Sequence, residues 1–232
     1  MIQQLPFDSG LFGYPVGKYV VREPWKEAEF LVQATDYRLV YLFSEVPIET
    51  TSEQITWVDT RLTFQKSLSE PLTQPEEIQP YSGRLTEVLL NLAWASGGHS
   101  RFKTDGGFKG GEFEKLYLQW ISGALESQEV LVAKDFSGMV TCTISSEKAQ
   151  IGLIAVKEDY RGKGLGKRLV EAAEAFAFLR GAKTLSIGTQ KTNFPAVSLY
   201  QRLGFGLIEQ LQVYHYWNNV IVRNSISGEI SY

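Results

Sequence analysis

The residues best suited to chemistry form a glycine-rich turn at residues 161–166, which reads Arg-Gly-Lys-Gly-Leu-Gly. An apolar run at residues 151–156 precedes the turn, and apolar side chains recur at helical spacing after it. The first backbone N–H groups of a helix have no intrahelical partner, and the helix dipole favours an anion there. Glycines also let the backbone approach a pyrophosphate closely. The turn is therefore predicted to bind a pyrophosphate, although three alternating glycines would equally serve a tight connection between strand and helix.

The spacing of these glycines excludes two other phosphate-binding turns. A Walker turn requires Gly-x-x-x-x-Gly-Lys-Ser/Thr, which residues 162–168 do not supply. The dinucleotide fingerprint Gly-x-Gly-x-x-Gly is absent from the same turn. What is left is the pattern Arg-x-x-Gly-x-Gly at the start of a helix.

A second group of candidate residues lies downstream, where Asn193 and Tyr200 are seven positions apart. That separation is close to two helical turns, so both side chains can lie on one helix face and line one site. Asn193 is a good N-cap residue and Gly204 is a typical helix stop, so a helix between them is well specified. Taken alone, Asn193 could be a cap only, and Tyr200 could be an ordinary core residue.

The two motifs together resemble the hallmarks of the GNAT superfamily of N-acetyltransferases. The turn matches the family's Arg-x-x-Gly-x-Gly, and residues 193–205 match its Asn-x-x-Ala-x-x-Leu-Tyr-x-x-x-Gly-Phe. The resemblance implies acetyl-CoA as the cofactor and no metal, with Asn193 on the pantetheine arm and Tyr200 beside the coenzyme sulfur as the catalytic general acid. The expected cofactor-binding residues are Ile154, Val156, Arg161, Gly162, Lys163, Gly164, Leu165, Gly166, Lys167 and Asn193.

The sequence departs from the family pattern at the general base. Many relatives place a Glu in the central strand, whereas residues 149–156 contain no carboxylate. Glu147 and Asp159 flank this strand, but a solvated surface carboxylate is the simpler interpretation of each, and neither is assigned a catalytic role. His99 and His215 are weak candidates, because the first falls in a predicted loop and the second in a terminal strand.

A narrower resemblance concerns the acceptor. Residues 5–13, 99–102 and 117–121 look like those of the dTDP-fucosamine acetyltransferases of bacterial surface-polysaccharide assembly. This resemblance implies that the acceptor is a small molecule, the amino group of a nucleotide-linked aminodeoxysugar. The alternatives are another small amine, a protein N-terminus, or a protein of a different class that binds acetyl-CoA without catalysis.

Three residues are expected to bind this substrate. Arg101 is predicted to pair with the diphosphate of the nucleotide sugar, and Phe102 or Trp120 to stack on a ring. An ordinary solvated loop charge explains Arg101 equally well.

Hydrophobic periodicity predicts the elements that must position these residues. A small α/β unit comes first, and its strand, helix, strand and strand are residues 16–22, 25–34, 38–43 and 55–66. Residues 67–83 contain three prolines and have the composition of a linker or long loop. The predicted domains are therefore residues 1–75, a small α/β N-terminal domain, and residues 76–232, the acetyltransferase domain.

The second domain alternates helices and strands. Helices are expected at 85–95, 113–125, from the glycine turn to about 180, and at 195–203, with a glycine-rich loop at 96–111. Strands are expected at 130–134, 139–145, 149–156 and 184–189 and from 205 and 210, with the run 151–156 covered on both faces. The fold class is α/β (α+β), and the resemblance implies the GNAT fold, a mixed central sheet flanked by helices.

Composition narrows the class of protein. The 232 residues carry a formal net charge of −3, so no nucleic-acid partner is expected. One Cys and 2 His exclude an internal disulfide and a Cys/His zinc cluster, which suits a reducing cytoplasm. The N-terminus has no basic lead, and no apolar run approaches the roughly 20 residues of a membrane helix, so neither a signal peptide nor membrane insertion is expected. The family resemblance also suggests a homodimer.

Overall fold

The computed structural model describes residues 1–70 and 73–218, and its contacts divide the chain into two compact units. The first unit comprises Met1–Arg61, Asp105–Glu112 and the described residues from Leu211 onward, and the second comprises Leu62–Thr104 and Phe113–Gln210. β4 (Ile55–Ser67) and β10 (Gly206–Trp217) contribute residues to both. The units are thus interleaved along the chain, and the domain boundary expected between residues 75 and 76 stays a prediction.

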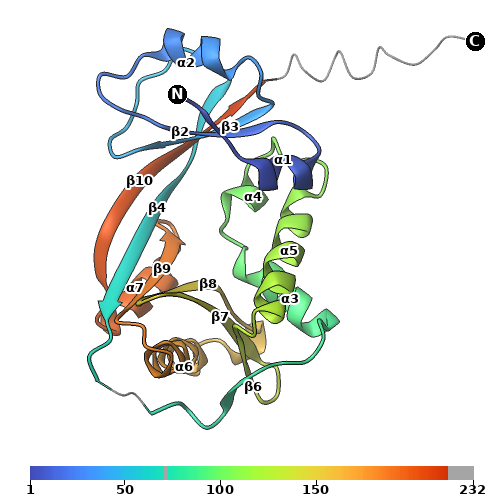
Figure 1. Cartoon of the computed structure of the whole chain (residues 1–232), viewed down its shortest axis with the longest axis vertical. Coiled ribbons are helices and arrows are strands. Elements are labelled where there is room, and N and C mark those ends of the chain that lie inside the picture. Colours follow the sequence, from blue (N-terminus) through green and yellow to red (C-terminus); the bar gives the residue numbers. More distant parts are fainter. Residues whose placement is uncertain (71–72, 219–232) are drawn as a thin grey trace, which may run out of the picture. The chain divides into compact units, whose positions relative to one another are not determined.

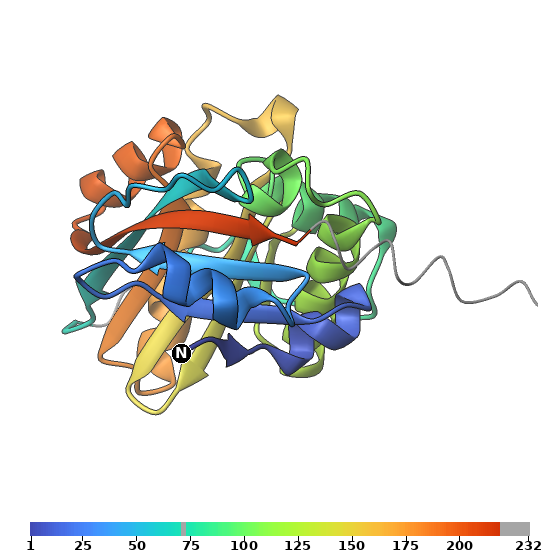
Figure 2. The same ribbon diagram turned by 90° about the horizontal axis from the view of Figure 1, so that it is seen from above.

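The first unit is a small mixed sheet with helices (Figures 1 and 2). Its strands pair in the order β1-β2-β3-β10, in which β2 and β3 are parallel and the other neighbours are antiparallel. Phe30 of α2 is fully buried and packs edge-to-face on Tyr216 of β10, with a ring distance of 5.5 Å. The elements wholly in this unit are β1 (Gln3–Gln4), α1 (Pro6–Phe12), β2 (Val16–Val20), α2 (Glu27–Ala34) and β3 (Leu39–Ser44).

The second unit is built on a sheet whose strands run in the order β9-β8-β7-β6-β5. β8 and β9 are parallel, whereas the remaining neighbours are antiparallel. The sheet is therefore mixed, as the sequence predicted. Its strands are β5 (Ile78–Pro80), β6 (Val130–Ala133), β7 (Gly138–Ser145), β8 (Lys148–Val156) and β9 (Thr184–Gln190).

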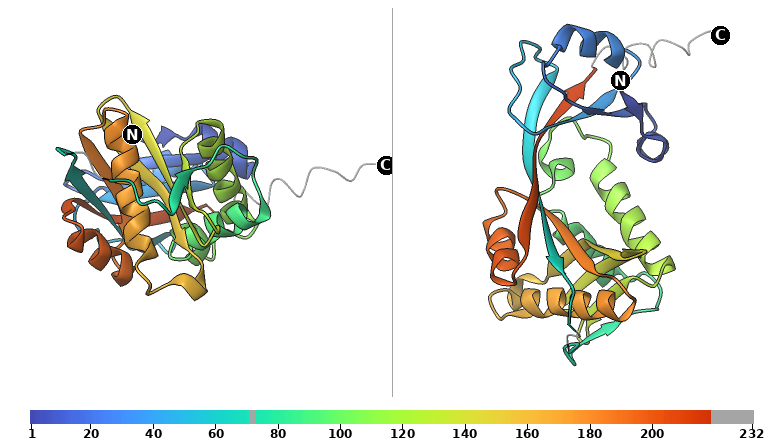
Figure 3. Two further views of the ribbon diagram at one scale, coloured as in Figure 1. Left: turned by 90° about the horizontal axis from the view of Figure 1, so that it is seen from below. Right: turned by 60° about the vertical axis from the view of Figure 1, so that its left-hand side comes forward.

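Helices flank this second sheet on both sides (Figures 1 and 3). α6 packs on β7 and β8 through an apolar stripe that includes Leu169, Ala173 and Phe176, and α3 packs on β8 from the other side. The helices of the unit are α3 (Glu87–Ser96), α4 (Arg101–Thr104), α5 (Glu112–Glu126), the 3-10 turn η1 (Glu158–Tyr160), α6 (Leu165–Leu179) and α7 (Phe194–Arg202), with Glu112 itself assigned to the first unit. No helix among the described residues is both long and apolar enough to cross a membrane.

Most predicted elements are confirmed within a few residues, and several features differ. α1 and β1 were not expected, and the predicted linker contains β5, a three-residue strand that pairs with β6 through main-chain bonds. The predicted loop at 96–111 contains the short helix α4. The strands expected from 205 and 210 form one continuous strand, β10.

A further difference lies in β8, which is not covered evenly on both faces. Buried and more exposed residues alternate along it, and Ile154 and Val156 are only partly buried. The prediction of a strand covered on both faces was wrong for these positions, because an apolar run does not reveal that one side of the strand faces a cleft.

Candidate active site

A β-bulge in β8 opens the site. Val140 of β7 pairs with Ile154, but Cys142 pairs with Ile151, so β8 has one extra residue opposite Thr141. The hydroxyl of Thr141 accepts a hydrogen bond of 2.9 Å from the Leu153 N–H and so holds the bulge. A bulge bends a strand and shifts which side chains face each side of the sheet.

The pairing between β8 and β9 ends at this bulge. The two parallel strands are in register from Lys148↔Thr184 to Ile151↔Ile187, and no pair follows, although β8 continues to Val156 and β9 to Gln190. The strands therefore part, and the edge of β8 beyond Ile151 is not paired with β9. Backbone groups on such an edge can bind an extended ligand, as in strand addition.

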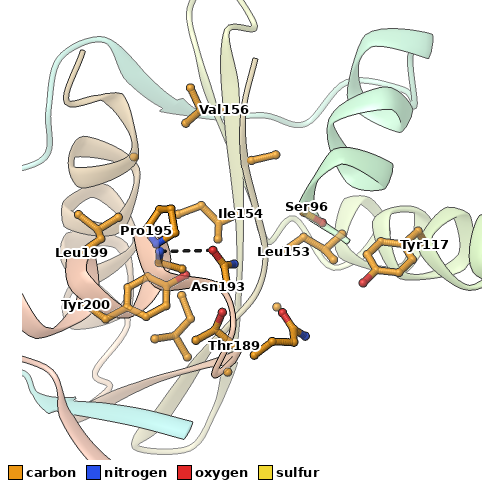
Figure 4. A pocket seen from close by; sticks show the side chains of 17 residues that line it. Ser96, Tyr117, Leu153, Ile154, Val156, Thr189, Asn193, Pro195, Leu199 and Tyr200 are labelled. Atoms are coloured by element: carbon orange, nitrogen blue, oxygen red, sulfur yellow. Dashed lines mark hydrogen bonds between the residues drawn. The ribbon is translucent and has the colours of Figure 1, made fainter. Parts of the chain in front are cut away.

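A cleft of about 300 Å³ occupies this gap and lies wholly in the second unit. Figure 4 shows Thr189 of β9 and residues of α7 on one side of β8, and Ser96 and Tyr117 on the other. The lining residues are Ser96, Tyr117, Gly152, Leu153, Ile154, Ala155, Val156, Gly166, Ile187, Gly188, Thr189, Gln190, Asn193, Pro195, Ala196, Leu199 and Tyr200.

The predicted turn stands at the cleft and starts α6. Gly164 is the N-cap residue of α6 with φ +80°, a conformation that disfavours residues with a side chain. The Arg161 Nε donates a hydrogen bond of 3.2 Å to the Val156 carbonyl, which ties the turn to the end of β8. Leu165 is buried in the core, whereas Gly166 lines the cleft. The buried Leu165 thus fixes the turn to the core, and the N-terminus of α6 lies beside the cleft. This geometry fits a pyrophosphate.

Asn193 and Tyr200 both line the cleft from α7, as their spacing predicted (Figure 4). The Asn193 side chain also caps α7, because its Oδ1 accepts a hydrogen bond of 3.4 Å from the Ala196 N–H. Tyr200 is 3% exposed and contacts the rings of Phe64 and Phe205 at 6.0 and 6.2 Å. Burial raises the pKa of its phenol above the ordinary value, so Tyr200 keeps its proton and can act as a donor.

Of the other predicted cofactor-binding residues, Ile154 and Val156 line the cleft, while Lys163 and Lys167 lie in and just after the turn. The Lys163 ammonium is 5.5 Å from the ring of Tyr160, and Lys167 pairs with Glu171 at 3.4 Å. Both cations are thus at the surface close to the turn. Their roles stay predictions.

The three residues predicted to bind the substrate do not line the cleft. Phe102 is buried and contacts the ring of Trp120 at 6.1 Å, and the Arg101 guanidinium lies 4.4 Å from the Phe102 ring. Trp120 in turn contacts Tyr117 at 4.9 Å, and Tyr117 does line the cleft. The structure thus brings this aromatic group to the cleft through Tyr117, which sequence reasoning missed because only tertiary packing carries α5 to β8. Binding roles for Arg101, Phe102 and Trp120 stay predictions.

The ionisable residues considered as bases lie elsewhere. Glu147 pairs with Lys183, Asp159 is exposed in η1, and His99 is exposed. His215 is buried in the first unit, where its Nδ1 contacts the carboxylate of Asp105. The described residues hold no group of three or more His, Cys, Asp or Glu that could bind a metal ion.

Comparison with known proteins finds a family and several relatives that this chain resembles. Residues 99–205 match the family described as Acetyltransferase (GNAT) family. The spore coat polysaccharide biosynthesis protein SpsD of Bacillus subtilis is 25% identical over 146 residues, covering 61% of this chain and 50% of that protein. The dTDP-fucosamine acetyltransferase of Escherichia coli O6:H1 is 30% identical over 125 residues, covering 50% of this chain and 53% of that protein. The chain thus spans about half the length of these curated relatives.

A solved structure agrees on the fold. The GCN5-related N-acetyltransferase from Sphaerobacter thermophilus superimposes with a TM-score of 0.53 at 17% sequence identity, covering 81% of this chain and 63% of that one. The architecture is the GNAT fold, a mixed sheet flanked by helices, as the sequence predicted.

Proposed function

We propose that this enzyme transfers the acetyl group of acetyl-CoA to the amino group of a nucleotide-linked aminodeoxysugar. Residues 99–205 match the GNAT acetyltransferase family, which supports the transfer of an acetyl group. The main support for acetyl transfer is the gap between β8 and β9. A helix N-terminus, a strand edge not paired with β9 and Tyr200 lie around the cleft in this gap. The sugar acceptor is supported by similarity to SpsD and to the dTDP-fucosamine acetyltransferase.

The turn and the strand edge would hold the donor. The N–H groups at the start of α6 suit the pyrophosphate, and the edge of β8 at Ile154 and Val156 suits the amides of the pantetheine arm. Asn193 would contact the same arm from α7. Acetyl-CoA, when bound, supplies a thioester whose acetyl carbon an amine can attack.

Tyr200 would stabilise the charge that develops on the departing sulfur. A free thiol has a pKa of roughly 8.5 and a phenol about 10, so complete proton transfer from Tyr200 is uphill in water. Burial raises the pKa of Tyr200 further. Tyr200 would therefore donate a hydrogen bond that strengthens as the carbon–sulfur bond breaks, and transfer its proton only late in that process.

Purified protein incubated with acetyl-CoA and a panel of amines tests this function. The panel contains dTDP-aminodeoxysugars, polyamines and peptides with a free N-terminus, and the measurements are thiol release and the acetylated product by mass spectrometry. We expect turnover with a dTDP-aminosugar. Turnover with peptides or polyamines alone would contradict the sugar acceptor, whereas binding of acetyl-CoA without turnover of any amine would identify a non-catalytic binding protein.

A further inference from the structure

The cleft has a second wall, which the donor proposed above does not use. On one side of β8, Ile154 and Val156 point toward α6 and α7, and on the other, Leu153 points toward Ser96 and Tyr117 (Figure 4). Because the pairing of β8 with β9 stops at Ile151, the gap joins the two sides. An acetyl group held along the edge of β8 can therefore be approached from the wall formed by Ser96, Leu153 and Tyr117, called here the α3–α5 wall.

Tyr117 is held firmly in this wall. It is 5% exposed, and its ring contacts Phe113 at 4.5 Å and Trp120 at 4.9 Å. Burial raises the pKa of its phenol, so the hydroxyl stays protonated at neutral pH.

The neighbouring Ser100 hydroxyl bears on whether the Tyr117 hydroxyl donates or accepts a hydrogen bond. The Phe102 N–H donates to the Ser100 Oγ at 3.3 Å. The Ser100 hydroxyl also acts on the Tyr117 phenol, where it lowers the pKa against the larger effect of burial, as a donor to the phenol oxygen does. Since the Ser100 Oγ already accepts a bond, its own proton is available to the Tyr117 oxygen. A tyrosine hydroxyl can accept one bond and donate another. The Tyr117 proton is then left to donate to a ligand in the cleft.

Gly97 provides the space for this ring. Its φ of −92° suits any residue, so backbone conformation does not require glycine there. A Cβ at position 97, however, would lie 2.3 Å from the Cζ and 2.6 Å from the Oη of Tyr117. The neighbouring Gly98 is different, because a Cβ there would meet only the Ala95 carbonyl oxygen at an ordinary 3.5 Å. The absence of a side chain at position 97 therefore leaves the space that the Tyr117 hydroxyl occupies.

We propose that Tyr117 orients the acceptor on the α3–α5 wall by donating a hydrogen bond to an oxygen of the acceptor's carbon framework, with Gly97 and Ser100 as positioning residues. The proposal rests on the proposed acetyl transfer and deepens it. A hydroxyl donor beside the apolar Leu153 suits a small amine that carries both hydroxyl or ring oxygens and apolar C–H faces, which is the chemistry of an aminodeoxysugar.

Steady-state kinetics of Tyr117→Phe against wild type tests the proposal, with the best amine found in the panel as acceptor. Loss of one neutral hydrogen bond predicts a rise in the acceptor KM of about 3- to 10-fold. The affinity for acetyl-CoA, measured by calorimetry, stays the same because the variant changes only the α3–α5 wall. For an amine without oxygen atoms, such as cyclohexylamine, the two proteins have equal KM values.

Gly97→Ala and Gly98→Ala are a matched pair of variants that tests whether the Tyr117 ring needs the space beside Gly97. Gly97→Ala raises the acceptor KM as Tyr117→Phe does, while Gly98→Ala leaves it unchanged. If Gly97→Ala does not fold, Ser100→Ala replaces it and raises the acceptor KM by roughly 2- to 5-fold. An acceptor KM that Tyr117→Phe leaves unchanged overturns the proposal while acetyl transfer stands. Wild-type protein that turns over no amine overturns both.

Discussion

The two units both bury ionisable side chains, but they satisfy them differently. In the first unit, Asp105 accepts hydrogen bonds from the Trp217 Nε1 at 2.8 Å and the Gly107 N–H at 2.9 Å, and it also pairs with His215. In the second unit, Tyr200 and Tyr117 line a cleft. A buried polar group whose partners belong to its own unit stabilises the fold, whereas one that lines a cavity is available to a ligand. Because its partner Asp105 belongs to the same unit, His215 stabilises the fold of the first unit.

The largest expected effect comes from Tyr200→Phe, which removes the phenol hydroxyl and keeps the ring contacts with Phe64 and Phe205. Loss of a general acid typically costs a factor of 10² or more, so we expect kcat to fall roughly 100-fold. The dissociation constant of acetyl-CoA should change little, because the hydroxyl acts only as charge develops. Thiol-release kinetics and calorimetry measure the two quantities. A kcat equal to that of wild type would remove Tyr200 from the mechanism.

Asp105→Asn gives the next largest effect, and it should lower the stability of the fold without changing the affinity for acetyl-CoA. Hydrogen bonds to a charged group contribute about 1.5–3 kcal/mol each, so we expect the unfolding free energy to fall by about 2 kcal/mol. Acetyl-CoA affinity should not change, since Asp105 lies in the first unit. Denaturant unfolding and calorimetry check both. An unchanged stability would mean that the cluster of Asp105, His215 and Trp217 is not what stabilises this unit.

The same cluster predicts how stability depends on pH. Burial alone would raise the pKa of Asp105, but hydrogen bonds from His215, Gly107 and Trp217 outweigh it and hold that pKa below its usual range. A carboxyl whose pKa is lowered on folding stabilises the protein above its unfolded pKa of about 3.9, and this contribution is lost as the pH falls through the folded value. Wild type should therefore lose more stability than Asp105→Asn on acidification below about pH 4. Asp159→Asn, at an exposed position, is the control and should behave as wild type.

The smallest effect distinguishes two glycines that share a positive φ of nearly the same value. Gly164 begins α6 at the cleft with φ +80°, and Gly181 follows the end of α6 with φ +84°. Alanine at either position should cost about 1 kcal/mol of stability because the left-handed region disfavours a Cβ. Only Gly164→Ala should also raise the dissociation constant of acetyl-CoA, by roughly 5-fold. Equal affinities in the two variants would contradict the pyrophosphate site at the turn.

The sequence predicted well those features that depend on neighbouring residues. Asn193 caps α7 and the glycine turn leads directly into α6, because capping and turn formation are properties of a few consecutive residues. The strand β5 was not predicted, because three residues ending in Pro80 carry no periodic pattern. They form a strand only because the edge of β6 is there to pair with them. The bulge in β8 escaped notice too, because it exists only relative to Thr141 on β7.

By itself, the sequence determined the side of the cleft that we propose for the donor, which is the glycine turn and the face of α7 that carries Asn193 and Tyr200. Both are set by spacing within one turn or one helix, and local hydrogen bonding enforces them. Only the tertiary structure decided the opposite wall, since Ser96 and Tyr117 meet Leu153 through the packing of helices on a sheet that parts at a bulge. No local preference of the chain encodes a contact between segments so far apart in sequence.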